Sequence, residues 1–290
     1  MFTRRDFIRL SAAAAATAAI PLRTHGQTAK NPATSTAPSR PEQLQAGSVK
    51  KGLGLGSRNP LWPRLLTDLE CKWCYTWTGV LPPDLPEGLQ FVPMIRSKQA
   101  TAEKITRIAD EAKAAGLTGL LGLNEPDARS QDDMTVGQAL EMWPLLMETG
   151  MRLGSPGCVH PDNPWMKEFM TGVEERGLRV DFVCVHSYGG PNPQALVNKL
   201  AKTLQLYDRP LWITEFGVGD WKAKEVGENE HGPEAVLRFM DNVLPMLEDL
   251  DYLERYAWFP ARPESGPLGT SALFDAEGRL TPLGERYRDA

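Results

Sequence analysis

The sequence predicts a single (β/α)8 barrel, and three observations support this fold class. Between Ser48 and Ala290, eight short apolar runs alternate with stretches that have the periodicity of helices. Most of the apolar runs lack an alternation of apolar and polar residues, which is typical of parallel strands covered on both faces. The segment also has close to the roughly 250 residues of a typical (β/α)8 barrel.

The eight predicted strands are short runs bounded by turn residues or by helices. They are residues 51–56, 71–77, 89–96, 118–124, 152–157, 180–188, 210–217 and 254–260. A doubly wound open sheet is the alternative fold. The stretch "GLGLGSRNP" does not favour it, because it gives no G-x-G-x-x-G motif ahead of a helix.

The segments between these strands have recognisable helix ends. In residues 101–116, apolar residues recur at spacings of three and four up to Gly116. Thr135 and Gln138 predict a capping box for the next helix. A long helix over residues 232–250 precedes the last strand, and Pro245 is expected to bend it. Two further helices are predicted to begin at an Asn N-cap followed by proline, at Asn163-Pro164 and Asn192-Pro193.

The first 47 residues are set apart from the barrel. Residues 1–26 have a basic start and an Ala-rich apolar run, the form of a secretory signal, and Arg4-Arg5 resembles a twin-arginine export signal. The apolar run at residues 10–22 is too short to span a bilayer of ~30 Å. Residues 27–47 are rich in Thr, Ser, Ala, Pro and Gln and predict a disordered linker. We therefore expect a periplasmic or secreted protein.

The charge of the chain argues against several classes of partner. The net charge is −5, and residues 1–26 contribute +3 from four arginines and one aspartate, so export would leave a mature chain of −8. An acidic chain without a basic stripe is a poor candidate for binding nucleic acid or anionic membranes. We expect no nucleic acid partner, no stable membrane association after export, and a monomer.

The four cysteines allow two interpretations. Cys71 and Cys74 fall in "CKWCYTW", a predicted strand in which residues three apart point to opposite faces. A redox or zinc site usually needs a turn at a C-x-x-C motif, and a second C-x-x-C is lacking. With Cys158 and Cys184, we expect buried thiols or one structural disulfide, which an oxidising compartment allows. A redox or metal site on Cys71 and Cys74 is the alternative; we expect neither a metal nor a cofactor.

Polar and aromatic residues collect at the C-terminal ends of the predicted strands, where the chemistry of such barrels is located. The candidates at or after these ends are Trp73, Trp77, Arg96, Asn124, Glu125, Trp165, His186, Tyr188, Glu215 and Trp258. Glu125 ends the fourth strand and Glu215 the seventh, so the two carboxylates should face each other across one mouth. This arrangement suits glycoside cleavage, in which one acid protonates the departing oxygen and the other carboxylate attacks the anomeric carbon.

The residues around these carboxylates resemble a known family. "LGLNEPD" and "LWITEFG", with "VDFVCVHSYGG" between them, are similar to the clan A barrel glycosidases and more narrowly to glycoside hydrolase family 128, whose members act on β-1,3-glucans. The resemblance covers most of the chain after about Val49. It implies Glu125 as the acid/base, Glu215 as the nucleophile, and Asn124 as the partner of the sugar 2-hydroxyl. Arg96 departs from the pattern, since the family often has Trp after the third strand.

Other residues are expected to support or bind the sugar. Tyr188 should donate a hydrogen bond to Glu215, and His186 should lie on the same face within reach of the sugar. Trp258 is expected to be the main stacking platform, because aromatic planes cover sugar faces. Core packing and stacking on a sugar are equally expected for Trp73, Trp77 and Trp165. Arg96 is expected to form hydrogen bonds or to bind acidic groups. An acidic sugar or a decorated glucan is therefore an alternative substrate.

The sequence predicts a retaining glycoside hydrolase that cleaves β-glucan, most simply with β-1,3 linkages, and whose partner is a polysaccharide or oligosaccharide. Two carboxylates and the bound sugar supply all the chemistry of this reaction, so no cofactor is expected. The alternative is a barrel that binds β-glucan without cleaving it.

Overall fold

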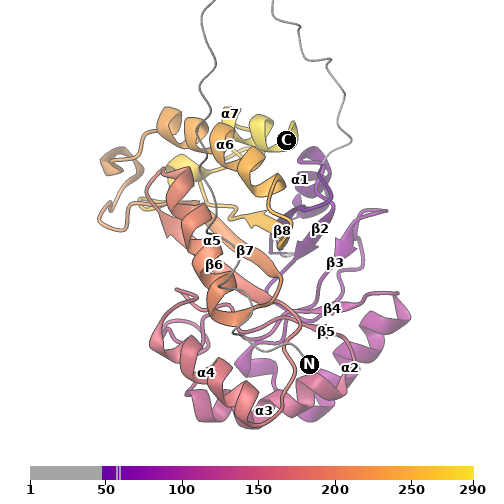
Figure 1. The fold of residues 1–290 in the computed structure, drawn as a ribbon. Helices are drawn as coiled ribbons and strands as arrows, with labels where there is room; N and C mark the ends of the chain where they lie inside the picture. Colours follow the sequence, from indigo (N-terminus) through magenta and orange to yellow (C-terminus); the bar gives the residue numbers. More distant parts are fainter. Residues whose placement is uncertain (1–47, 57, 59) are drawn as a thin grey trace, which may run out of the picture. The chain divides into compact units, whose positions relative to one another are not determined.

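The structure, a computed structural model, describes residues 48–56, 58 and 60–290, so the predicted signal (1–26) and linker (27–47) lie outside the described residues. Within this range eight strands follow one another along the chain (Figure 1). They are β1 Lys51–Gly54, β2 Trp73–Tyr75, β3 Gln90–Phe91, β4 Gly119–Leu120, β5 Arg152–Leu153, β6 Val183–Gly189, β7 Leu211–Val218 and β8 Leu253–Trp258.

The strands close into a parallel barrel. Six of them form one sheet in the order β3-β2-β1-β8-β7-β6, and β4 pairs with β5. Single parallel bridges join the two groups, from Met94 to Leu121 on one side and from Gly154 to Phe182 on the other. Each strand therefore neighbours the next in sequence, and the last neighbours the first. The predicted (β/α)8 barrel is confirmed.

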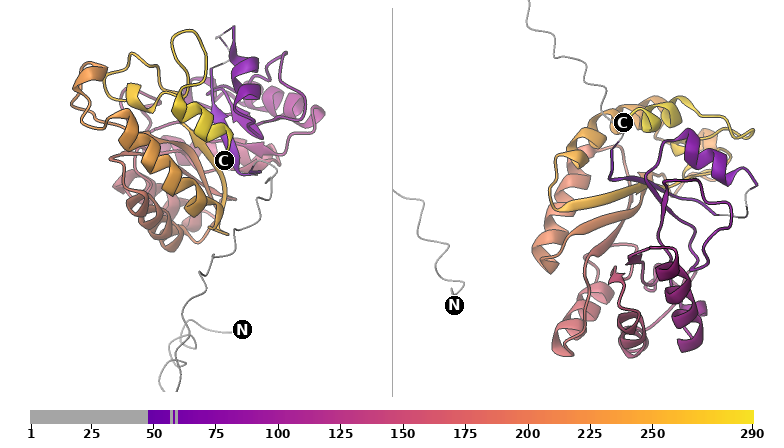
Figure 2. Two further views of the ribbon diagram at one scale, coloured as in Figure 1. Left: turned by 90° about the horizontal axis from the view of Figure 1, so that it is seen from above. Right: turned by 90° about the vertical axis from the view of Figure 1, so that its right-hand side faces the viewer.

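Helices follow seven of the eight strands and lie outside them (Figures 1 and 2). They are α1 Trp62–Asp68, α2 Ala102–Ala114, α3 Val136–Glu148, α4 Pro164–Glu175, α5 Pro193–Tyr207, α6 Pro233–Glu248 and α7 Pro282–Arg288. No helix lies between β2 and β3 in the described chain, which differs from eight full strand-helix units. Pro82, Pro83 and Pro86 occur in that connection, and three prolines within five residues would each remove a backbone hydrogen bond from a helix interior, which disfavours a helix there.

The predicted helix starts are confirmed in detail. The Thr135 side chain accepts from the Gln138 amide, and the Gln138 side chain accepts from Thr135, which completes a capping box. Asn163 and Asn192 each cap a helix that has proline at its first position. α6 continues past Pro245 to Glu248. Among the described helices, none is both long and apolar enough to cross a membrane.

The interior of the barrel is filled by large side chains. A cluster of buried residues from six strands and their extensions occupies it: Trp73, Tyr75, Val92, Met94, Leu121, Phe182, Cys184, Trp212 and Ala257. At the N-terminal end of the strands, the Arg255 guanidinium stacks 4.2 Å from the ring centroid of Trp212. Side chains therefore fill the barrel at the N-terminal end of its strands, and a ligand can enter only at the C-terminal mouth.

All four cysteines are free and buried. Cys74 belongs to β2, as the pattern predicted, and not to a turn. Burial raises the pKa of the Cys71 thiol to about 12, so it stays protonated and unreactive at neutral pH. The expectation of buried thiols is confirmed, and the burial of Cys71 and Cys74 does not favour the alternative of a redox or metal site.

Candidate active site

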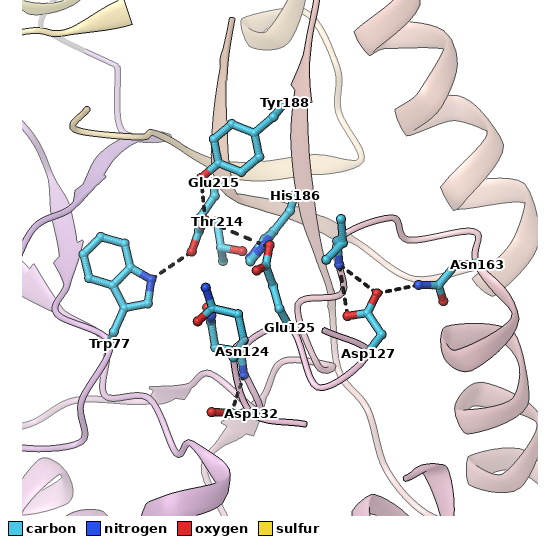
Figure 3. Close-up of polar contacts among 12 residues, drawn as sticks. Trp77, Asn124, Glu125, Asp127, Asp132, Asn163, His186, Tyr188, Thr214 and Glu215 are labelled. Atoms are coloured by element: carbon cyan, nitrogen blue, oxygen red, sulfur yellow. Dashed lines mark hydrogen bonds and ion pairs between the residues drawn. The ribbon is translucent and has the colours of Figure 1, made fainter. Parts of the chain in front are cut away.

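A cavity of about 740 Å³ opens at the C-terminal mouth of the barrel, and both predicted carboxylates line it. Glu125 follows β4 and Glu215 lies within β7 (Figure 3). Their side chains are 14% and 7% exposed, so each carboxylate is largely withdrawn from water but still reaches the cavity. We call this cavity the catalytic cleft.

Glu125 has an unusual backbone. Its φ is +44°, in the left-handed region that non-glycine residues rarely adopt. The conformation is held by its amide, which donates to the Gly157 carbonyl oxygen at 2.7 Å, and by a bridge between Asn124 and Gly157. Such strain costs about 1–3 kcal/mol and gathers at functional sites, where surrounding contacts keep a side chain aimed.

Glu215 is surrounded by hydrogen-bond donors. The Trp77 indole N–H donates to its Oε1 at 2.8 Å, and the Tyr188 hydroxyl donates to its Oε2 at 2.5 Å. The Tyr75 hydroxyl, 3.3 Å from Oε1, shares its hydrogen with the Thr214 carbonyl oxygen. Burial and the charge of Glu215 raise the pKa of Tyr188, so its phenol keeps the proton it donates. These donors occupy both oxygens of the Glu215 carboxyl group and fix its orientation.

His186 lies between the two carboxylates (Figure 3). Its Nδ1 is 3.0 Å from Glu125 Oε1 and 3.8 Å from Glu215 Oε2, and one oxygen of each carboxylate and a ring nitrogen lie within 4.8 Å of one another. Burial lowers the pKa of this imidazole, but the charge of Glu215 and the bond to Glu125 outweigh burial, so the pKa is raised. The two acidic neighbours of His186 thus favour the charged form of its ring, while its burial opposes that form.

The same three groups are the cluster, among the described residues, that could hold a metal ion. However, Trp77 and Tyr188 each direct a hydrogen at one of the two oxygens of Glu215. A cation on those oxygens would face the positive ends of both donors. The surroundings of Glu215 therefore fit a free carboxylate better than a metal ligand.

Most of the predicted site residues come together at this mouth. Trp77, Arg96, Asn124 and Tyr188 line the cleft with the two glutamates, while His186 is fully buried behind them. Asn124 is 3% exposed, and its Oδ1 has no hydrogen-bond partner within the described chain. The predicted hydrogen bond from Tyr188 to Glu215 is confirmed.

Three predicted stacking residues are placed elsewhere, and those predictions are wrong. Trp258 is fully buried outside the barrel wall, where it packs on Phe216 and Tyr287. Trp73 is 1% exposed and lies deep in the barrel, with its indole N–H bonded to the Lys50 carbonyl oxygen. Trp165 stacks on Phe169 of α4 and donates to the Met134 carbonyl oxygen, away from the cleft.

Phe259, one position after Trp258, was not among the predicted residues, yet it lines the cleft. Trp221, a residue that is 63% exposed, lines the cleft as well. Tyr75 shares the face of Trp77 in the same strand segment, because alternate strand residues point to one side, and its hydroxyl reaches Glu215 from within the barrel. Asp132, which holds Arg96 and Asn124 from a loop, has no signal in the sequence.

Comparisons with known proteins agree with this geometry. A family model described as "Glycosyl hydrolase catalytic core" matches residues 57–287. A subgroup I endo-β-1,3-glucanase of glycoside hydrolase family 128 from Amycolatopsis mediterranei, solved as a mutant in complex with laminarihexaose, is 32% identical with a TM-score of 0.73. The match covers 84% of this chain and 100% of that one.

Two other subgroups of the same family are also similar. A subgroup II endo-β-1,3-glucanase from Sorangium cellulosum is 25% identical, with a TM-score of 0.69. A subgroup III curdlan-specific exo-β-1,3-glucanase from Blastomyces gilchristii is 28% identical, with a TM-score of 0.66. Both matches cover 82% of this chain and 97% of the other. No curated protein matches the sequence. By the family model and by its likeness to these enzymes, the chain belongs to glycoside hydrolase family 128.

Proposed function

We propose that this glycoside hydrolase cleaves β-1,3-glucan with retention, with Glu215 as the nucleophile and Glu125 as the acid/base. The observation that carries the proposal is the separation of the two carboxylates, which approach within 4.8 Å in one cleft. Retaining enzymes hold their carboxyl groups ~5–5.5 Å apart, whereas inverting enzymes need ~6.5–9.5 Å to admit a water.

In the first step, protonated Glu125 gives its proton to the glycosidic oxygen while Glu215 attacks the anomeric carbon. The bond to the leaving chain breaks, and a glycosyl ester forms on Glu215. In the second step, ionised Glu125 takes a proton from a water that attacks the same carbon. The ester bond breaks, and both carboxyl groups return to their starting states.

The neighbours of the pair have separate tasks. The donors Trp77 and Tyr188 fix the orientation of Glu215 for attack on the anomeric carbon. His186 Nδ1, 3.0 Å from Glu125 Oε1, holds the carboxyl group of Glu125 in position for both proton transfers. Asn124 lines the cleft beside Glu125, and its side-chain amide is the group assigned to the 2-hydroxyl of the sugar that is cleaved.

Two observations support a β-1,3-glucan chain as the substrate. The 32% identical Amycolatopsis enzyme is an endo-β-1,3-glucanase solved with laminarihexaose. In this chain a second cavity of about 540 Å³ shares Trp77, Phe259 and Leu268 with the catalytic cleft. Sugars on one side of the cleaved bond would have room there, which supports cleavage within a chain.

The test is hydrolysis of laminarin and curdlan, with a β-1,4-glucan as control. We expect new reducing ends from the β-1,3-glucans, and NMR should show the β-anomer as the first product. Glu215→Gln should abolish turnover but keep substrate affinity. Glu125→Gln should be slow on glucan and partly spared on activated aryl glycosides, which need no acid. Binding without any cleavage by the wild type would favour the alternative of a glucan-binding barrel.

We also infer that the chain is exported through residues 1–26, because Arg4-Arg5 precedes an apolar run of signal-peptide form. Fractionation of cells that express the full chain tests this. The wild type should accumulate outside the cytoplasm, and replacing both arginines by lysine should retain it inside. Equal export of both proteins would contradict a twin-arginine route.

A further inference from the structure

Arg96 lies in the wall of the catalytic cleft, in the connection between β3 and α2. Its Nε donates to Asp132 Oδ1 at 2.9 Å, and its Nη2 donates to Gln131 Oε1 at 3.2 Å. These two acceptors fix the plane of the guanidinium. The Nη1 group and one hydrogen of Nη2 have no acceptor within the described chain, so they are available to a ligand in the cleft.

Asp132 joins this arginine to the catalytic strand. Its side chain is fully buried, and its Oδ2 accepts from the backbone amides of Ser97 at 3.1 Å and Asn124 at 3.0 Å. Asn124 directly precedes Glu125. One buried carboxylate therefore joins the loop after β3, which holds Arg96 and Ser97, to the residues that follow β4. Figure 3 shows its bond to the amide of Asn124.

The positive charge of Arg96 is compensated by the carboxylate of Asp132. A buried carboxylate at 2.9 Å compensates the guanidinium, so the pair offers hydrogen-bond donors rather than a free positive charge. An acidic sugar would bring a second negative charge next to Asp132. A neutral sugar hydroxyl can accept from the remaining N–H groups without this cost.

We propose that Arg96 is a specificity-determining residue that binds hydroxyl groups of a neutral glucosyl unit beside the catalytic pair, and that Asp132 is the positioning residue that holds it. The inference rests on the proposed function and deepens it. The guanidinium group is rigid and its N–H donors are directional. Arg96 therefore selects sugars by the orientation of their hydroxyl groups more strictly than a stacked aromatic ring would.

The first test measures kcat and KM on laminarihexaose for Arg96→Ala and for a matched control, Arg129→Ala. Arg129 belongs to the loop that carries Asp132, but it is exposed and lies outside the catalytic cleft. Loss of a charged hydrogen bond to substrate should raise KM about tenfold in Arg96→Ala, with kcat changed less than about twofold. Arg129→Ala should match the wild type. Equal KM values in the two variants would overturn the role of Arg96.

The second test separates positioning from folding. Asn at position 132 can still accept from the two backbone amides, but it turns an N–H₂ group toward Arg96 Nε. Asp132→Asn should therefore reproduce the KM of Arg96→Ala, and the double variant should be no worse than Arg96→Ala alone. If Asp132→Asn instead lowers kcat and the melting temperature while its effect persists in the Arg96→Ala background, Asp132 is only structural and the proposal fails.

The third test addresses the neutral sugar. Calorimetry should show tighter binding of laminarihexaose than of the same oligosaccharide oxidised to carboxylates at C6. If the oxidised ligand binds more tightly to the wild type, and Arg96→Ala removes that preference, the site recognises an acid and the inference is wrong. An inactive wild type would instead refute the proposed function, whereas an active wild type with identical Arg96 and Arg129 variants refutes this inference alone.

Discussion

His186 is held by a glycine as much as by its carboxylate partners. A Cβ at Gly157 would lie 2.7 Å from His186 Nε2, closer than real Cβ contacts allow. The same Nε2 is buried and has no hydrogen-bond partner within the described residues. On its other side, Nδ1 is bonded to Glu125. The imidazole therefore has one position, and the backbone of Gly157 also carries the carbonyl that holds Glu125.

Gly157→Ala should accordingly impair catalysis. The added methyl group pushes the ring of His186 toward Glu125, and overpacking of this kind costs about 1–3 kcal/mol. We expect kcat on laminarin to fall at least about tenfold, since a small misplacement of catalytic groups is costly. Gly189→Ala is the control, because a Cβ there meets nothing within 4 Å. Full activity of Gly157→Ala would show that His186 is free to move.

His186 also predicts how stability depends on pH. Its pKa in the folded protein is raised above the ordinary histidine value of 6.5 by the charge of Glu215 and the bond to Glu125, so the unfolded chain loses this proton first as pH rises. The stabilisation is fully present below 6.5 and is lost as pH rises through the folded value. Melting temperatures of the wild type and His186→Gln should therefore converge with rising pH. His160→Gln, at an exposed histidine, should show no such trend; a constant difference for His186→Gln would contradict the argument.

At the scale of the element, side-chain parity decides which predicted residues reach the cleft. On β8, Tyr256 and Trp258 point outward to the helices, so Ala257 and Phe259 point inward, and the predicted platform was one residue off. The inner face of β2 and its extension carries Trp73, Tyr75 and Trp77. Of these three, only Trp77 is close enough to the C-terminal mouth of the barrel to line the cleft. Apolar runs without alternation do not show which face of a strand points into the barrel. The sequence therefore could not predict which of two adjacent residues reaches the cleft.

The same parity separates two neighbouring aromatic residues experimentally. Trp258→Ala removes a fully buried ring and should destabilise the protein by about 3–5 kcal/mol, while KM for laminarihexaose stays near the wild-type value. Phe259→Ala removes a cleft-lining ring and should raise KM with a much smaller loss of stability. Denaturant unfolding and steady-state kinetics on both variants check this. The reverse pattern would mean that the strand register is misassigned.

Prediction was better for strand ends than for loops. Glu125, Glu215 and Tyr188 follow apolar strands, and the barrel rule brings such ends to one mouth. Asp132 comes from the turn after Glu125, and its burial depends on how residues 126–134 fold back onto Ser97. The missing helix after β2 was signalled by its prolines. Contacts that depend on the path of a loop are set by tertiary packing, which periodicity does not encode.

At the scale of the whole molecule, two adjacent lysines join the first strand to the last helices. The Lys50 ammonium donates to the carbonyl oxygens of Leu247, Glu248 and Leu250 at the end of α6. The Lys51 ammonium, in a fully buried side chain, donates to those of Tyr287, Arg288 and Ala290 at the end of α7. Each lysine thus satisfies carbonyl groups that a helix C-terminus leaves unpaired. The first strand and the last two helices are thereby held together at the end of the barrel opposite the cleft.

Lys51→Met should therefore unfold the protein more easily without changing its chemistry. The substitution keeps an apolar stem but removes three hydrogen bonds from an ammonium, and buried bonds to charged groups contribute about 1.5–3 kcal/mol each. We expect a loss of about 3 kcal/mol or more in the free energy of unfolding, with kcat and KM of the folded fraction unchanged. Lys72→Met, at an exposed lysine just before β2, is the matched control and should lose less than about 0.5 kcal/mol. If denaturant unfolding gave both variants equal stability, the α7 carbonyl groups would have to find other donors, and the closure of the barrel would not depend on this lysine.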